Sequence, residues 1–364
     1  MCVCLPLIFE KECGCPSNRQ SKAHAYHYGV QRSNTCSSVL QCNMSAVDVL
    51  DPGAPLPPRV CQALFKARRE PLVIKGQLNS WTKSRFWTPN NICRHLGSKT
   101  TAFKISPKRD SPIFQKRFSE KEVVYETQCD YVETTFNNFL EWLDCSSSTP
   151  SKDDGGSEIK TPLCKRVKLD PSQSGESSTG DKASHPSQTT SIDSSSELPS
   201  RETHNPLMDY SKTNYWIYAD YEYMVHLCKD LPDMLSSVDW SVIGFDARDG
   251  KDSTLWIGSE GAHTPCHFDT YGCNFVAQLF GKKKWILFDP QDSDKLYPTR
   301  VPYEESSVFC RVNITNPDII KYPLFNEATA YEVSCILLLT RFHFVCTFVL
   351  YICIACHNIR TIVC

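Results

Sequence analysis

The feature that most constrains this chain is a His-Phe-Asp tripeptide set between two stretches that read as β-strands. His267 and Asp269 lie two residues apart. Side chains at positions i and i+2 of a strand share one face, so both groups can point into the same cavity. An imidazole and a carboxylate are two of the three ligands of the 2-His-1-carboxylate site for non-haem Fe(II). The tripeptide therefore indicates an iron site with a third ligand far downstream, and the alternative interpretation is a solvated polar turn.

The residues around the tripeptide favour the metal site. Thr264 precedes it, and Asn274 opens an apolar strand pattern. A turn at Gly281, three lysines at 282–284 and a second strand pattern at 285–288 follow, and this order predicts a hairpin. A lysine of this turn could enter the cavity and pair with a carboxylate, to which the Thr264 hydroxyl could also donate a hydrogen bond.

Further motifs extend this pattern in both directions along the chain. They are residues 254–258, 261–267, 296–298, 302–309, 316–318 and 322–325. With these motifs in this order, residues 71–333 resemble the JmjC (cupin) branch of Fe(II)/2-oxoglutarate oxygenases, close to its asparaginyl-hydroxylase subgroup. The resemblance excludes a Ser-rich insertion that interrupts this segment.

The resemblance implies a mainly β fold with flanking helices, a double-stranded β-helix of the jelly-roll type. It implies Fe(II) bound by His267 and Asp269, with no catalytic residue beyond the metal ligands. The residues implied to contact 2-oxoglutarate are Thr264, Asn274, Lys283 and Tyr218. The subgroup implies hydroxylation of a protein side chain, and demethylation of a methyl-lysine stays open. A small heat-shock protein as partner, and a role in the stress response, follow from the same resemblance.

The chain departs from the family pattern after Val333. Family members continue with a Pro-Gly turn and an aromatic stretch whose His is the third iron ligand, whereas residues 334–364 are apolar and Cys-rich and contain no Gly, Pro or Trp. The later histidines, His343 and His357, lack the family context. We therefore expect a fold truncated before its last strands, with impaired or absent catalysis. A non-catalytic cupin scaffold is the alternative, because two ligands hold iron less tightly than three.

Three interpretations of this tail stay open. An alternative exon joined to a truncated domain is favoured, because composition and motif change at one point. A membrane helix is a second interpretation, since residues 335–356 are long enough to span a bilayer, although Arg341 and His343 would be costly there. The third is a buried pair of strands.

The remaining chain divides by composition. Residues 1–58 read as a disordered leader, 59–145 as an N-terminal layer of helices and strands, 146–212 as a disordered Ser-rich insertion, 213–333 as the cupin core and 334–364 as the atypical tail. The insertion cannot bury enough apolar surface to offset the entropy of ordering it. The aromatic residues of the N-terminal layer are interpreted as core.

Charge and cysteine content limit the kinds of partner and the cellular compartment that we expect. Lys and Arg number 39 against 41 Asp and Glu, so the net charge of −2 gives no field that recruits nucleic acid, and neither direct nucleic-acid binding nor a membrane partner is expected. The 20 cysteines are spread through a long chain without a secretory signal, which favours a reducing, cytoplasmic location. A basic run from Lys165 to Asp170 resembles a nuclear-import signal and adds the nucleus as an alternative.

Overall fold

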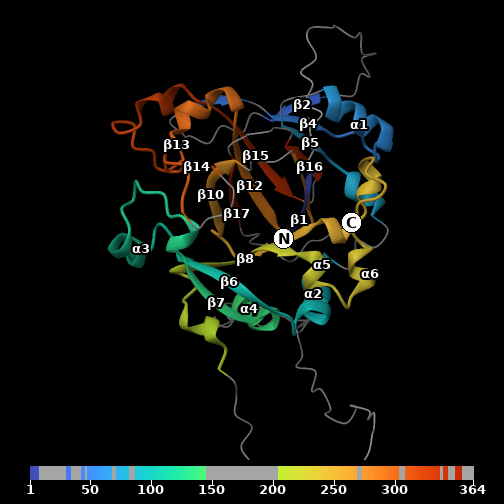
Figure 1. The fold of residues 1–364 in the computed structure, drawn as a ribbon, viewed down its shortest axis with the longest axis horizontal. Helices are drawn as coiled ribbons and strands as arrows, with labels where there is room; N and C mark the ends of the chain where they lie inside the picture. The colour runs from blue at the N-terminus through green and yellow to red at the C-terminus, as the bar shows by residue number, and fades with distance from the viewer. Residues whose placement is uncertain are drawn as a thin grey trace, which may run out of the picture.

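Two β-sheets face each other at the centre of the molecule, and helices lie around them (Figure 1). The computed structural model describes residues 1–7, 30–33, 42–45, 47–67, 71–81, 87–144, 204–268, 273–302, 308–336, 339–342 and 349–354. The larger sheet has the strand order β2 (Val30–Ser33), β4 (Val47–Leu50), β5 (Leu72–Ile74), β16 (Leu339–Phe342), β11 (Cys273–Gln278), β1 (Cys2–Leu7), β9 (Thr254–Gly258), β8 (Tyr215–Tyr223), β6 (Thr100–Pro107) and β7 (Asp130–Thr135). The smaller sheet has the order β13 (Pro298–Thr299), β14 (Val308–Cys310), β10 (His263–Phe268), β17 (Val349–Ile354), β12 (Lys282–Phe288), β15 (Thr329–Ile336) and β3 (Asn43–Ser45).

The space between the sheets is filled by large side chains that alternate along the strands. On β12, Trp285 and Leu287 point inward, while Ile286 and Phe288 join a separate cluster on the outer side. Trp216 and Tyr218 of β8, Trp256 of β9, Val276 of β11 and Val333 of β15 complete the inner cluster. This arrangement of two facing sheets confirms the expected jelly-roll fold of the cupin type.

The outer face of the larger sheet is covered by the N-terminal layer. In the described part of the chain, the helices of this layer are α1 (Pro58–Ala67), α2 (Pro89–Leu96), α3 (Pro112–Arg117) and α4 (Phe136–Asp144), and α5 (Met224–Leu227) and α6 (Pro232–Leu235) follow β8. Short 3-10 segments are η1 (Gln77–Ser80), η3 (Glu126–Gln128), η4 (Pro206–Asp209), η5 (Trp240–Ile243), η6 (Gly250–Asp252), η7 (Pro290–Leu296) and η8 (Pro323–Glu327). Phe65 of α1 and Phe139 of α4 pack in one cluster with Phe103 of β6 and Phe275 of β11. The aromatic residues of this layer are thus core, as predicted, and β6 and β7 extend the larger sheet.

Both predicted disordered segments contain ordered parts. β4 lies in the expected leader, and its Val47 and Val49 are buried because the strand pairs in parallel with β5. η4 lies inside the expected Ser-rich insertion, where Leu207 is fully buried and Asn205 Nδ2 donates to the carbonyl oxygen of Asn138 at 2.9 Å. Composition missed these segments because a few apolar residues suffice for a short element that docks on an existing core. The basic run from Lys165 to Asp170 lies outside the described residues.

The predicted hairpin after Asn274 is wrong. β11 belongs to the larger sheet, where it pairs with β1 and β16, whereas β12 belongs to the smaller sheet and pairs with β15 and β17. Gly281, with a φ of 74°, turns the chain from one sheet into the other. The turn residue was identified correctly, but a turn signal does not specify which strands pair.

The sheets do not stop at Val333, in contrast to the expected truncation. β16 pairs with β11 and β5, and β17 lies between β10 and β12. The tail thus contains two strands, as its third interpretation expected, but they lie in different sheets and do not pair with each other. The physical reason for these strands is that β10, β11 and β12 each need a second neighbour for their backbone hydrogen bonds, and the tail is rich in β-branched and aromatic residues. The alternative-exon interpretation stays a prediction. Across the described ranges, the helices are all too short or too polar to cross a membrane.

Candidate functional site

Lys283 is buried on the inner face of β12 and reaches across to the facing sheet. Its Nζ donates a hydrogen bond to the Tyr218 hydroxyl at 3.1 Å. The same ammonium lies 4.8 Å from the ring centre of Trp285, 5.4 Å from that of Trp256 and 5.7 Å from that of Tyr218. Lys283 is 3 % exposed and Tyr218 is fully buried. A cation surrounded by aromatic faces is attracted by the ring quadrupoles, most strongly when it is desolvated.

Strand alternation selects Lys283 from its two lysine neighbours. Because Trp285 and Leu287 point inward, Lys283 shares their face, while Lys282 and Lys284 lie on the other. Lys284 Nζ accordingly pairs with Glu332 of β15 at 2.9 Å. Lys283 is therefore the lysine of this turn that points into the barrel, and its contact with 2-oxoglutarate stays a prediction.

A bulge in β10 allows Thr264 and His267 to share the inner face. In a regular strand, residues three apart point to opposite sides. The pairing of β10 with β17 shifts register between Thr264 and His267, as a bulge produces. After the bulge, Cys266 and Phe268 belong to the outer cluster, so His267 between them points inward.

The imidazole of His267 is held in the orientation and tautomer of a metal ligand. His267 is 4 % exposed, and its Nδ1 lies 2.8 Å from the carbonyl oxygen of Pro265. A carbonyl oxygen only accepts, so Nδ1 carries the proton and the lone pair of the neutral ring lies on Nε2. Fixing one ring nitrogen to a carbonyl is the usual way in which proteins orient a ligating histidine.

Thr264 carries a buried hydroxyl that lacks a hydrogen-bond partner in the described part of the chain. Its side chain is 1 % exposed, and Oγ1 is one of the unsatisfied buried oxygens. A buried hydroxyl without a partner costs free energy, and native proteins usually retain one for a reason. The hydroxyl can donate to an acceptor placed in the interior beside it.

The other predicted site residues are placed only in part. Asn274 of β11 shares the inward face of Val276 by alternation and is half-buried. Asp269, His343 and His357 lie outside the described residues. Within the ranges that the structure describes, three or more His, Cys, Asp or Glu side chains do not gather into a metal cluster. The carboxylate and distal ligands therefore stay predictions.

A buried charged cluster that the sequence analysis missed lies beside Tyr218. Lys104 of β6 is 1 % exposed, pairs with Asp220, and has its Nζ 2.8 Å from Glu126. The same Nζ lies 5.5 Å from the ring centre of Tyr218. Burial opposes the charge of Lys104, but the two carboxylates raise its pKa above the ordinary value. The sequence signal for this cluster was a lysine and an aspartate, each within a strand pattern. Each of them alone is also typical of the solvent-exposed face of a strand.

The inner face thus presents an ammonium, a phenol and an unsatisfied hydroxyl, with an amide on β11 of the larger sheet. All four groups can donate a hydrogen bond, and a carboxylate is the ligand group that such a donor set suits. The residues present therefore fit an anionic carboxylate ligand, and the His267 tautomer fits a divalent metal beside it.

Comparisons with known proteins agree with this fold. The model of the cupin-like domain family matches residues 58–337. HSPB1-associated protein 1 of Mus musculus is 34 % identical over 284 residues, which cover 78 % of this chain and 46 % of that protein. JmjC domain-containing protein D of Dictyostelium discoideum is 35 % identical over 89 residues, 24 % of this chain and 19 % of that protein. Lysine-specific demethylase 8 of Danio rerio is 32 % identical over 108 residues, 30 % of this chain and 25 % of that protein.

The matched segment covers most of this sequence, so the chain belongs to the cupin-like (JmjC) domain family. It resembles HSPB1-associated protein 1 along most of its length, while it spans about half the length of that relative.

Proposed function

We propose that the interior of the barrel binds 2-oxoglutarate beside Fe(II), as in a JmjC-type oxygenase that acts on protein side chains. The observation that carries this proposal is the buried contact between Lys283 and Tyr218, 3.1 Å long and walled by Trp256 and Trp285. A buried ammonium and phenol between facing sheets form a specific cradle for one carboxylate. The unsatisfied Thr264 hydroxyl supports the same assignment.

In this proposal, the residues divide into two groups. Lys283, Tyr218 and Thr264 hold the carboxylate of 2-oxoglutarate that lies far from the metal, and Asn274 contacts the same ligand. His267 through Nε2, together with Asp269, holds Fe(II). When bound, Fe(II) and 2-oxoglutarate supply the oxidation of a substrate C–H bond by oxygen.

The chain itself contributes orientation and a dry interior. The aromatic walls exclude water, which strengthens the hydrogen bonds of Lys283 and Tyr218 to an anion because the local dielectric is low. The Pro265 carbonyl keeps the proton on Nδ1 of His267 and so leaves Nε2 to bind the metal. We expect impaired turnover in this chain, because the family motif of the third ligand is absent after Val333 and two protein ligands hold iron loosely.

The test is Fe(II)-dependent conversion of 2-oxoglutarate to succinate by the full chain, after circular dichroism has established folding. We expect slow turnover that Asp269→Ala abolishes. Single His343→Ala and His357→Ala variants then identify a downstream ligand by a similar loss. A folded chain that neither converts nor binds 2-oxoglutarate would contradict the proposal.

A second candidate function is a cupin scaffold that binds a small heat-shock protein. The observation in its favour is the likeness, at 34 % identity, to proteins named for association with HSPB1. Isothermal titration of the full chain with HSPB1 tests it, with Asp269→Ala as the matched variant. A scaffold binds equally well with and without Asp269, whereas the absence of binding by the folded wild type would exclude this function.

A further inference from the structure

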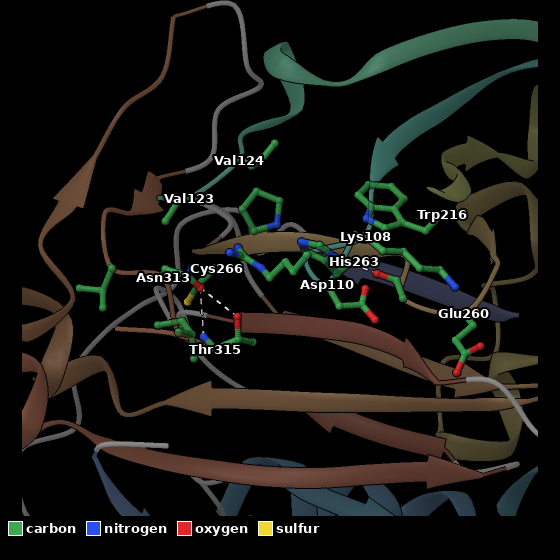
Figure 2. Close-up of a pocket in the computed structure, with 15 residues that line it drawn as sticks. Lys108, Asp110, Val123, Val124, Trp216, Glu260, His263, Cys266, Asn313 and Thr315 are labelled. Atoms are coloured by element: carbon green, nitrogen blue, oxygen red, sulfur yellow. Dashed lines mark hydrogen bonds between the residues drawn. The ribbon is translucent and has the colours of Figure 1, made fainter. Parts of the chain in front are cut away.

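A cavity of about 430 Å³ lies beside β10, and Trp216 of the inner cluster forms part of its wall (Figure 2). Its walls come from residues 108–110 after β6, from residues 123–124, from the turn between β9 and β10, and from residues 312–315. The described groups of the 2-oxoglutarate site, Thr264, His267, Tyr218, Lys283 and Asn274, do not line it. The cavity is therefore separate from the site proposed above, and its size is that of a pocket for a small organic ligand.

Arg109 brings a positive charge into this cavity without an acidic partner in the described part of the chain. Its Nη1 donates to the carbonyl oxygens of Glu120 at 3.3 Å and Glu122 at 3.4 Å, and the guanidinium lies 5.3 Å from the ring centre of Phe114. Carbonyl oxygens carry no full negative charge, so the charge is not neutralised. Burial lowers the pKa of Arg109 to about 10, which still leaves the group charged at neutral pH.

A second donor in the same cavity is the indole of Trp216. Its side chain is 3 % exposed, and Nε1 is buried without a hydrogen-bond partner among the described residues. Figure 2 shows the indole beside His263, and the two ring centres are 5.1 Å apart. An indole N–H can only donate, so this buried group requires an acceptor that the described protein groups do not supply.

His263 does not add a charge to the cavity. Its Nδ1 lies 2.9 Å from the carbonyl oxygen of Gly261, which fixes the proton on Nδ1. Burial, with a smaller effect of Arg109, lowers the pKa of His263 to about 4. The imidazole is therefore neutral at physiological pH, and the cationic side chains that line the cavity are Arg109 and Lys108.

The remaining walls restrict the kind of anion. Val124, Val312 and Ile314 are buried and apolar. Asp110 and Glu260 are exposed at the rim, where their negative charges disfavour ligands with several negative charges, such as phosphates.

We propose that this cavity binds a monocarboxylate with an apolar body, whose carboxylate accepts hydrogen bonds from Arg109 and from Trp216 Nε1 while its hydrocarbon part packs on the valines. The carboxylate could belong to a free acid or to a peptide.

The test follows the indole N–H signal of Trp216 by two-dimensional NMR of the full chain, with the signal assigned by its loss in Trp216→Phe. Phenylacetate is the probe, phenylacetamide is its neutral match, and inorganic phosphate is the multiply charged comparison. We expect a saturable shift with phenylacetate only. An equal shift with the amide, or no shift with phenylacetate, would overturn the assignment.

Variants distinguish the loss of the Arg109 charge from a loss of folding. Arg109→Gln should weaken phenylacetate binding about tenfold or more, because it removes a charge-assisted hydrogen bond. The exposed Arg311→Gln is the matched control and should bind as the wild type does. Unchanged affinity in a folded Arg109→Gln variant contradicts the proposal. Lys283→Met should leave this binding intact, which distinguishes the cavity from the 2-oxoglutarate site.

The two sources of the carboxylate are distinguished with a peptide acid. N-acetyl-leucyl-phenylalanine is compared with its C-terminal amide and with phenylacetate. Tighter binding of the peptide acid than of phenylacetate assigns a peptide terminus, and tighter binding of phenylacetate assigns a free acid. In either case, the amide should not shift the Trp216 signal, and a shift with the amide would exclude carboxylate recognition.

Discussion

Lys283 illustrates how a buried charge can be accommodated before any ligand binds. Transfer of an ammonium from water into a protein interior is costly, and here the cost is offset by the Tyr218 hydroxyl and by three aromatic rings within 6 Å. The ammonium of Lys283 is therefore already oriented before a ligand binds. A carboxylate that enters the interior therefore meets a donor that needs little rearrangement.

A substitution at Thr264 can distinguish a structural role of its hydroxyl from a role in ligand binding. Thr264→Val keeps the shape of the side chain and removes the unsatisfied hydroxyl, so we expect the free energy of unfolding to stay equal or to rise by about 1 kcal/mol. Affinity for 2-oxoglutarate should fall about tenfold, since a hydrogen bond to an anion is lost. Urea denaturation and isothermal titration measure the two quantities. A loss of stability with unchanged affinity would show that the hydroxyl supports the fold instead.

His263 should make the stability of the fold depend on pH below neutrality. Its pKa is lowered from 6.5 to about 4, chiefly by burial and further by Arg109 and Lys104. Between these two values the unfolded chain binds a proton that the folded chain does not, so stability rises with pH across the window and is lost on acidification. The contribution is at most about 3 kcal/mol. Urea denaturation from pH 4.5 to 7.5 should show a shallower slope for His263→Gln, and equal slopes would contradict the burial of this imidazole.

At the scale of elements, the site depends on how β8 packs against β9. Tyr218 pairs with Gly258, and a Cβ at Gly258 would lie 2.8 Å from the Tyr218 ring and 3.0 Å from the Ala262 side chain. β8 also carries a register shift between Ala219 and Glu222, and Tyr221 within it has a φ of 56°. Such bulges re-aim side chains, and here the bulge follows the residue that contacts Lys283.

Gly258→Ala should displace the Tyr218 ring and weaken 2-oxoglutarate binding, by about tenfold if the hydrogen bond to the ligand is lost. The matched control is Gly250→Ala, whose Cβ would lie 2.6 Å from the Leu235 carbonyl oxygen, away from the site. Both variants should unfold at lower temperature, and only Gly258→Ala should change the affinity of the folded protein in calorimetric titration. Equal affinities in the two variants would show that Tyr218 does not contact the ligand.

Local patterns predicted many of the elements but not their pairing. The apolar spacing near Val60 and the run at Leu72–Ile74 correspond to α1 and β5. Lys283 came from the family resemblance and not from a local pattern, and the burial pattern of β12 places it on the inner face. Strand pairing depends on contacts between distant residues, which explains the wrong hairpin across Gly281 and the unexpected β4. The interaction of Lys104 with Asp220 could not be predicted either, because it joins β6 and β8 across 116 positions of the chain.

At the scale of the whole molecule, two sheets enclose the candidate site, and strands from both ends of the sequence complete them. β1 lies between β11 and β9, and β17 lies between β10 and β12. A ligand held between Lys283 of one sheet and Tyr218 of the other therefore links the sheets. Such a ligand should stabilise the whole barrel in proportion to its binding free energy.

Thermal unfolding of the full chain in Mn(II), with increasing 2-oxoglutarate, tests whether the barrel interior binds this ligand. The variants compared with the wild type are Lys283→Met and Lys282→Met. We expect a rise in Tm for the wild type and for Lys282→Met, corresponding to about 2.7 kcal/mol at one hundred times Kd. In Lys283→Met the rise should be absent or much reduced. No rise in the wild type, or an equal rise in Lys283→Met, would contradict the claim that the barrel interior binds 2-oxoglutarate.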